Sequence, residues 1–474
     1  MDKSKNAPNA LTPLQEKFFA QRSDKSIFYK AQSQAFEYMD QVNQRPVFPD
    51  PRALEGLAEF DEELPGAMAH PREILDLLHG QGSPATVAQT GGRYFGFVNG
   101  NALPVAQAAK WLADIWDQNP ALYVISPVAA KLEQVCESWL KELLGLPETT
   151  KAGFVGGTST ATLCGLAAGR EHLLSKMGWD VNERGLNGAP QLRVILGAEA
   201  HATVYKALAL LGLGTANVET VAADDQGRIR SDLLPELDET CLVILQAGNV
   251  NSGAFDPLEE IGERAREAGA WIHIDGAFGL WAAGCEETRH LTAGLELADS
   301  WSVDAHKTLN APYDCGIALC RHPESLVRAM QATGSYIIYS ENRDSMLYTP
   351  EMSRRSRAVE LWATLKCLGR EGVDALVSGL CATAREFAEA LKAQGFTIRN
   401  TVAFNQVLVG LDRPEETDAF VAALQDSGVC WCGGAVWKGG AVVRISVCSW
   451  ATTAEDVARS VAAFVAARRA VAEK

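Results

Sequence analysis

The segments Trp271-Ile-His-Ile-Asp275 and Ser300-Trp-Ser-Val-Asp-Ala-His-Lys307 decide the fold predicted from this sequence. Each begins as a short, largely apolar run and ends in polar residues, a pattern typical of a buried strand that opens into a loop at its carboxyl end. Further runs of this kind are Arg193–Leu196, Leu242–Leu245 and Gly316–Cys320. Helical patterns alternate with them, so we predict an α/β protein with a large, mostly parallel sheet covered on both faces.

Start and stop signals mark two of the helices. The segment Pro127–Leu144 combines a proline in the first turn with a regular apolar stripe. Before the strand at Trp271, Asp256 is expected to cap a helix that Pro257 opens and Gly269 ends. The apolar stripe of this second helix consists of Leu258, Ile261, Ala265 and Ala268.

The pattern along the chain changes twice, which predicts three regions. Residues 1–100 are rich in proline and polar residues and form an N-terminal helical arm. Residues 101–365 form the large domain. Residues 366–474 combine helices with a strand-like VAFNQVLVGL at 402–411 and a strand at Ala441–Val447, which predicts a small α+β domain.

Composition excludes several classes of function. The formal charge of -16 argues against nucleic-acid binding, which needs a concentrated basic surface. The N-terminus has no signal-peptide pattern and no apolar stretch is long enough to span a bilayer, so we expect a cytoplasmic protein with no membrane contact. The 11 cysteines form no recurring framework, and Cys430-Trp-Cys432 has no second ligand pair, so reduced structural thiols are favoured over a metal site.

Ligands of open α/β sheets bind beyond the carboxyl ends of the strands, where this chain places Asp275, Lys307 and His201. A lone aspartate there is usually a turn or cap residue, a lone lysine usually a solvated charge, and a lone histidine usually a loop residue. Together they indicate pyridoxal 5′-phosphate (PLP) chemistry. The lysine can form a Schiff base with PLP, and the carboxylate can keep its pyridine nitrogen protonated.

The segment Gly156-Gly-Thr-Ser-Thr160 lies between an apolar run and a helical pattern. Exposed amides and hydroxyls at a helix N-terminus bind anions such as the phosphate of PLP. The same residues also simply start helices, so this signal is weak by itself. The segment matches neither the Walker A pattern nor GxGxxG, which disfavours nucleotide binding.

With these residues in view, the chain resembles the group II PLP-dependent decarboxylases, the family of aromatic-L-amino-acid, histidine and glutamate decarboxylases. The resemblance extends from Arg45-Pro-Val-Phe-Pro to Arg444-Ile-Ser-Val-Cys-Ser-Trp, and its most specific parts are His273-Ile-Asp-Gly-Ala-Phe and His306-Lys307. It implies PLP fold type I, the aspartate-aminotransferase type with a seven-stranded sheet. It also implies a homodimer with active sites at the subunit interface.

The resemblance implies a role for each site residue. Lys307 forms the Schiff base, Asp275 pairs with the pyridine nitrogen, and His201 and Ala277 cover the two faces of the ring. The phosphate is held by Thr158 and Ser159, with help from Asp304 and His306. Substrate contacts come from Phe97, Val98 and, from the neighbouring subunit, Tyr123.

Two segments depart from the family pattern. Gly248-Asn-Val-Asn251 stands where the family often has Gly-Thr-Thr, which removes a hydroxyl near the cofactor. The segment 335–355 resembles the family's mobile catalytic loop but is shorter than in the animal aromatic decarboxylases. Tyr336 is the best match for the tyrosine that returns a proton to Cα. Tyr339 and Tyr348 compete for this role, and any of the three could instead be a packing residue.

The predicted function is PLP-dependent decarboxylation of an L-amino acid to the amine and CO2. The substrate is expected to be aromatic or bulky and apolar, because Phe97, Val98 and Tyr123 supply no cation for a side-chain carboxylate and the nearby Arg93 is expected to face solvent. The alternatives are another PLP reaction on this scaffold, such as decarboxylation-coupled oxidative deamination, an aldol-type lyase or an aminotransferase, and an inactive PLP-binding regulatory protein.

Overall fold

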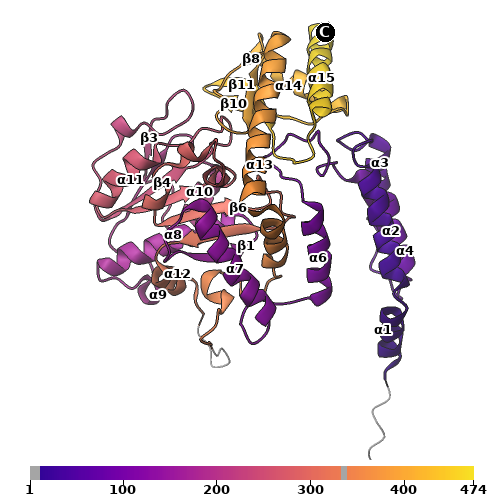
Figure 1. Cartoon of the computed structure of the whole chain (residues 1–474), viewed down its shortest axis with the longest axis horizontal. Helices are drawn as coiled ribbons and strands as arrows, with labels where there is room; N and C mark the ends of the chain where they lie inside the picture. The colour runs from indigo at the N-terminus through magenta and orange to yellow at the C-terminus, as the bar shows by residue number, and fades with distance from the viewer. Residues whose placement is uncertain (1–10, 333–338, 474) are drawn as a thin grey trace, which may run out of the picture.

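The computed structural model describes residues 11–332 and 339–473, which build two sheets and an N-terminal helical arm (Figure 1). The larger sheet has seven strands in the order β1-β7-β6-β5-β4-β2-β3. Its strands are β1 (Lys151–Val155), β2 (Arg193–Gly197), β3 (Val218–Val221), β4 (Cys241–Gln246), β5 (Trp271–Asp275), β6 (Ser300–Asp304) and β7 (Gly316–Cys320). The five strands predicted from apolar runs are confirmed to within a residue or two at each end.

The sheet is parallel through its centre and antiparallel at one edge. β3, β2, β4, β5 and β6 pair in parallel, whereas β7 is antiparallel to both β6 and β1. The parallel register places Gln246 of β4 beside Asp275 of β5, and Asp275 beside Ser302 of β6. The carboxyl ends of these three strands therefore meet at one edge of the sheet.

Helices cover both faces of the large sheet, as predicted. One face packs on α8 (Thr158–Lys176), α10 (Ala202–Leu210) and α12 (Pro323–Met330). The other face packs on α7 (Pro127–Leu144), α11 (Leu258–Glu267) and α13 (Ala358–Ala393). In β5 the two faces alternate, since Trp271 joins the first core and Ile272 and Ile274 join the second.

Asp256 does not cap the helix that follows it, so this part of the prediction was wrong. Helix α11 begins after Pro257 without a side-chain cap. The Asp256 carboxylate instead accepts hydrogen bonds from the backbone N–H groups of Ile229 (2.8 Å) and Gln246 (2.7 Å). Both N–H groups are buried, so leaving them without an acceptor would cost more free energy than leaving the first turn of α11 without a side-chain cap. Burial raises the pKa of Asp256 to about 6.

The smaller sheet is antiparallel, with the order β10-β11-β9-β8. Its strands are β8 (Thr397–Ile398), β9 (Gln406–Gly410), β10 (Gly433–Trp437) and β11 (Gly440–Ser446), and α14 (Thr417–Asp426) and α15 (Ala454–Ala472) pack on it. Phe387, Phe420 and Phe464 centre its core. The predicted boundary at residue 365 falls inside α13, close to a kink at Gly369 (φ 57°), and stays a prediction.

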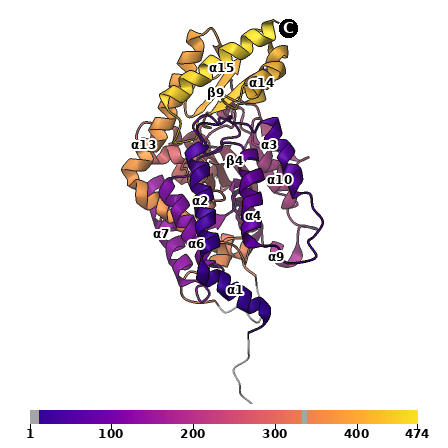
Figure 2. The same cartoon turned by 90° about the vertical axis from the view of Figure 1, so that its right-hand side faces the viewer.

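The N-terminal arm lies along one flank of the large domain (Figures 1 and 2). Its helices are α1 (Pro13–Asp24), α2 (Ser26–Gln41), α3 (Pro51–Glu55) and α4 (Pro71–Leu77), and the short α5 (Ser83–Ala85) leads toward α6 (Pro104–Trp116). None of helices α1 to α4 buries a residue. In the described part of the chain, every helix is too short or too polar to span a membrane.

A buried ion network joins α7 to the segment that precedes α13. Glu133 accepts from Arg343 (3.1 Å) and Arg354 (2.7 Å), and Arg343 also donates to Glu137 (2.7 Å). Burial alone would raise the pKa of Glu133, but the guanidinium groups of Arg354 and Arg343 outweigh it and lower that pKa. Glu133 therefore stabilises the fold when it is ionised.

We expect Glu133→Gln to reduce the free energy of unfolding by on the order of 3–5 kcal/mol at pH 7, because the buried Arg354 loses its counter-charge and the buried Arg343 keeps only Glu137. The matched control is Glu142→Gln on the same helix, where the pair with Arg370 is exposed and contributes about 1 kcal/mol or less. Because the folded-state pKa of Glu133 is lowered, its contribution is present above about pH 4.3 and is lost as pH falls. Denaturant unfolding of the two variants at pH 7 and pH 4 checks this, and equal effects of the two variants would contradict it.

Candidate active site

A cavity of about 420 Å³ lies at the carboxyl ends of β4, β5 and β6. It brings together most of the residues that the sequence singled out: Phe97, Val98, Thr158, Ser159, His201, Asp275, Ala277, Asp304, His306 and Lys307. Asp275 and Asp304 are the last residues of β5 and β6, and Lys307 lies in the turn that follows β6. His201 precedes α10 and Thr158 begins α8.

Asp275 is buried at the floor of this cavity, and burial raises the pKa of its carboxyl group. The positive charges of His201 and Lys307 act in the opposite direction and favour the carboxylate. Burial lowers the pKa of His201, whose Nδ1 lies 2.7 Å from Thr203 Oγ1 and accepts a hydrogen bond from the Thr203 N–H. A buried carboxylate in these surroundings can pair with the protonated ring nitrogen of a bound heterocycle.

Asp304 connects Lys307 to the start of α8. Its Oδ2 lies 2.9 Å from Lys307 Nζ, and its Oδ1 accepts from the Thr158 N–H at 2.7 Å. His306 Nδ1 accepts from the Cys315 N–H at 3.0 Å, so the ring proton sits on Nε2, which faces Asp304 at 3.6 Å. Asp304 thus fixes both the lysine and the helix N-terminus at the cavity.

The residues at the start of α8 fit the phosphate of PLP. Thr158 Oγ1 is buried and has no hydrogen-bond partner among the described residues, which leaves it available to a bound anion. A Cβ at Gly157 would lie 3.5 Å from His306 and 3.6 Å from Asp304, so glycine keeps this end of the cavity open. The N-terminus of a 19-residue helix adds its own favourable field for an anion.

The segment Gly248–Asn251, which departs from the family pattern, forms a tight turn at the cavity wall. Gly248 has φ of +98°, and a Cβ there would meet the Phe278 ring at 3.1 Å. The Asn249 side chain accepts from the N–H groups of Asn251 and Ser252 at 2.9 and 3.1 Å. The asparagine therefore stabilises the turn, in which Gly248 and Val250 line the cavity.

Sequence reasoning missed several residues of the cavity and its wall. Tyr313 stacks on the His306 ring at a centroid distance of 4.1 Å, and its hydroxyl donates to Asn99 at 3.0 Å. Arg444 of β11 donates to the carbonyl of Val250, which lines the cavity. An arginine inside a predicted buried strand was the available signal for Arg444, whereas no sequence pattern marks Tyr313.

Some predicted residues lie elsewhere. Tyr123, expected to act from the neighbouring subunit, donates its backbone N–H to Asp344 and does not line the cavity of its own chain. Tyr336 lies outside the described residues. Tyr339 donates to the carbonyl of Ala332, and Tyr348 packs under the guanidinium of Arg343 at 4.7 Å, so neither lines the described cavity.

The expectation that Arg93 faces solvent was wrong. Its side chain is buried, pairs with Asp456 at 3.4 Å and donates to the backbone carbonyls of Val429 and Asn43. These bonds tie the N-terminal arm to the small domain. A guanidinium buried with several acceptors is held by them, so Arg93 does not supply a cation to the cavity.

The fold and this lysine–aspartate–histidine cavity define a PLP-dependent enzyme of fold type I. The family described as "Pyridoxal-dependent decarboxylase conserved domain" matches residues 89–409, and the chain belongs to this family. PLP is accordingly the cofactor that the cavity fits.

Curated relatives differ in substrate. The aromatic-L-amino-acid decarboxylase of Bacillus atrophaeus is 27% identical over 369 residues, 74% of either chain. The acidic amino acid decarboxylase GADL1 of Mus musculus is 30% identical over 297 residues, which cover 59% of this chain and 53% of the relative. The 4-hydroxyphenylacetaldehyde synthase of Rhodiola rosea is 29% identical over 269 residues, which cover 53% of either chain. The matches to GADL1 and to this synthase therefore span about half the length of those two relatives.

Solved structures confirm the fold over nearly all of the chain. The structure of Oryza sativa TDC with PLP and tryptamine superposes with a TM-score of 0.86 at 22% identity, covering 98% of this chain and 99% of that one. The structure of mouse CSAD gives a TM-score of 0.86 at 21% identity, covering 94% and 98%.

We expect Lys307→Ala to abolish the borohydride-reducible link between PLP and the protein, because no second lysine lines the described cavity. The matched control, Lys206→Ala, removes an exposed lysine of α10 and should retain the link. The amount of PLP covalently attached after reduction, measured by mass spectrometry, checks this. Undiminished attachment in Lys307→Ala would exclude Lys307 as the anchor.

Proposed function

We propose that this protein decarboxylates an L-amino acid, with PLP bound through Lys307. The observation that carries the proposal is the convergence of Lys307, Asp275 and His201 in one cavity at the carboxyl ends of the parallel strands. Membership of the decarboxylase family supports the reaction type. When bound, PLP supplies an electron sink for the electron pair left on Cα after CO2 departs.

The chain's own residues hold and tune the cofactor in this proposal. Thr158 and Ser159 bind the phosphate, with Asp304 and His306 fixing the start of α8 around it. Asp275 holds a proton at the pyridine nitrogen, because a buried carboxylate strongly favours a cationic partner. His201 and Ala277, which both line the cavity, cover the two faces of the ring.

Arg444 is the residue that we assign to the substrate carboxylate. Its guanidinium lies beside the cavity wall at Val250, and burial lowers its pKa without a described acidic partner. Its positive charge also adds to the burial that lowers the pKa of His201. A half-buried guanidinium with free donors is suited to bind and orient a carboxylate.

The substrate side chain is proposed to be aromatic or bulky and apolar. Phe97, Val98, Val250 and Phe278 give the cavity apolar walls. In this proposal the cofactor is held by Lys307, His201 and His306, and the α-carboxylate is held by Arg444. Arg93 is bound to Asp456 and to the backbone of Asn43. A second carboxylate in the described cavity would lack its own cation, at a cost of several kcal/mol.

Return of a proton to Cα is proposed for Tyr336, in the segment outside the described residues. If the proton is not returned, dioxygen can accept the two electrons left on Cα, and the products besides CO2 change from the amine to the aldehyde, ammonia and hydrogen peroxide. An aldehyde product is what the name of the Rhodiola rosea relative indicates for that protein. Product identity therefore separates simple decarboxylation from decarboxylation coupled to oxidative deamination.

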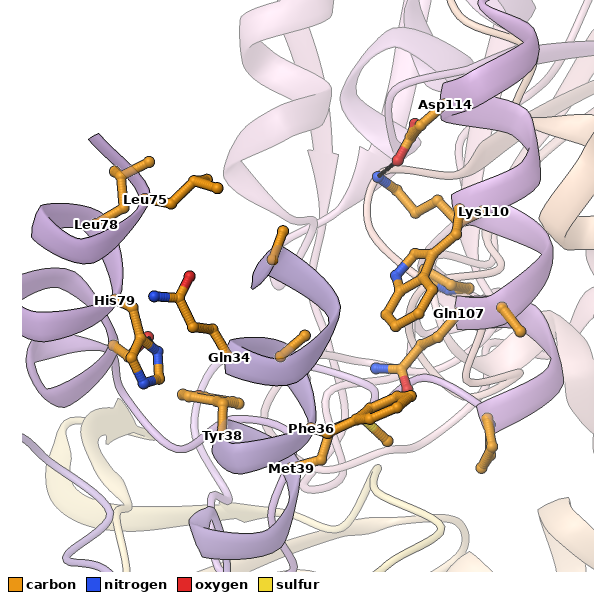
Figure 3. Close-up of a pocket in the computed structure, with 17 residues that line it drawn as sticks. Gln34, Phe36, Tyr38, Met39, Leu75, Leu78, His79, Gln107, Lys110 and Asp114 are labelled. Atoms are coloured by element: carbon orange, nitrogen blue, oxygen red, sulfur yellow. Dashed lines mark hydrogen bonds and ion pairs between the residues drawn. The ribbon is translucent and has the colours of Figure 1, made fainter. Parts of the chain in front are cut away.

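The enzyme is further proposed to be a homodimer formed through the N-terminal arm and α6. The arm helices bury no residues, yet α2 exposes Phe28, Tyr29 and Phe36, and α6 exposes Leu112 and Ile115. A groove of about 680 Å³ between α2, α4 and α6 is lined by Phe36, Met39 and Trp111 among others (Figure 3). Helices with so little interior are unstable alone, and exposed apolar surface of this extent marks an interface.

Sedimentation of the PLP-loaded protein should give twice the mass of one chain at micromolar concentration. Ile115→Asp should weaken the dimer by about tenfold or more, because it places a charge in an apolar interface. Leu210→Asp is the matched control, since Leu210 is equally exposed but lies on α10, away from the arm. A monomeric parent protein would overturn the proposed assembly.

A screen for CO2 release from the twenty common amino acids tests the proposed reaction and substrate. We expect kcat/KM for tryptophan, tyrosine or phenylalanine to exceed that for glutamate and aspartate by roughly 100-fold, from the cost of an unpaired buried carboxylate. Asp275→Asn should lower the rate by about 100-fold or more while retaining PLP. Preference for an acidic substrate would overturn the substrate assignment alone, whereas no turnover of any amino acid would overturn the reaction.

A further inference from the structure

A cluster of two histidines and a glutamate lies at the edge of the large sheet opposite to the cavity. His172 belongs to α8, while His322 and Glu324 form the start of α12. Next to the cluster, Trp271 begins β5 and Asp299 directly precedes β6. The opposite ends of these two strands carry Asp275 and Asp304. One ligand atom from each of the three cluster residues lies within 4.8 Å of the other two.

Hydrogen bonds fix which nitrogen of His322 is free. Its Nε2 lies 2.9 Å from Asp299 Oδ1, and the other oxygen of that carboxylate accepts from the Ile272 N–H at 2.8 Å. The carboxylate can only accept, so Nε2 carries a proton, and Nδ1 is the nitrogen that can offer a lone pair to a metal ion. That Nδ1 faces Glu324 Oε1 at 3.8 Å, beyond hydrogen-bonding distance.

A hydrogen bond also holds the ring of His172. Its Nδ1 lies 3.1 Å from the hydroxyl of Ser325, in the first turn of α12. This contact occupies Nδ1 and leaves Nε2 available to a metal ion.

We propose that His172, His322 and Glu324 bind a divalent transition metal ion, best matched by Zn²⁺, with water as the fourth ligand. Two imidazoles and a carboxylate are a common zinc donor set, and a carboxylate behind a ligating histidine, as Asp299 lies behind His322, is the usual way to orient such a ligand. Trp271 packs against both rings, at centroid distances of 5.2 and 5.3 Å, and gives the site an apolar wall.

The geometry needs only a small adjustment to close around a metal. Bonds of about 2.0–2.1 Å in a tetrahedron place ligand atoms roughly 3.4 Å apart. Glu324 is exposed and free to move by this amount, and the rings of His172 and His322, whose centroids lie 4.7 Å apart, would turn to bring their nitrogens to the same distance. The bound ion would fasten the start of α12 to α8, so its expected effect is on stability and not on the chemistry at Lys307.

The test uses the untagged, PLP-loaded protein, with Zn²⁺ alone as the probe. After exposure to Zn²⁺ and dialysis into metal-free buffer, we expect about one tightly held zinc per chain and a rise in Tm of about 2 °C or more when Zn²⁺ is present. His172→Gln and His322→Gln should lose both effects. His290→Gln, which removes an exposed histidine outside the cluster, should keep both. Asp299→Asn should weaken zinc binding by about 10–100-fold.

PLP content and far-UV circular dichroism establish that each variant is folded. If the histidine variants do not fold, Glu324→Gln decides, because this exposed side chain can be changed without disturbing the core. Zinc bound equally by the parent and by every folded cluster variant would overturn the site and assign the metal to exposed thiols such as Cys367. A parent protein that retains no zinc would also overturn it and leave the cluster as an ion pair between His322 and its two carboxylates.

Discussion

The parallel pairing of β4, β5 and β6 is the constraint on which the candidate site depends. It aligns Gln246 with Asp275 and brings the residues after β6 to the same edge of the sheet. A slip of one residue would exchange the two faces of β5 and move Trp271 out of one core and Ile272 and Ile274 out of the other, so the packing holds Asp275 at the cavity. A shift of one residue would turn that carboxylate away from Lys307 and toward the packed helices.

Charged groups are buried in two different ways in this protein. In the network of Glu133 and Glu137 with Arg343 and Arg354 each carboxylate faces a guanidinium group, and Lys151 also pairs with Glu137, so the network fixes the segment before α13. At the cavity the charges are left incompletely matched: burial raises the pKa of Asp275 and lowers that of His201. A buried titratable group without a matching partner lowers the stability of the folded chain. The same group can bind a charged cofactor.

The two edges of the same sheet therefore serve different purposes. The carboxyl edge gathers the PLP cavity, whereas the opposite edge gathers His172, His322 and Glu324, which we propose as a metal site that holds α12 in place. Asp275 and Asp304 end β5 and β6, and His322 and Glu324 follow β7 closely. Strand ends are where polar side chains can leave the apolar layers without losing the support of a rigid sheet.

The sequence by itself determined the α/β class, the five strand positions, helix α7 and the identities of Lys307, Asp275 and His201 as candidates. These follow from local patterns, since apolar periodicity and strand-end polarity are properties of short segments. The tertiary structure decided that Asp256 binds two buried N–H groups instead of capping α11. It also decided that Arg93 is held between the arm and the small domain. The positions of Tyr313 in the cavity and of Arg444 beside its wall were likewise set by the tertiary structure. Each of these depends on contacts between segments far apart in the chain, which no local pattern encodes.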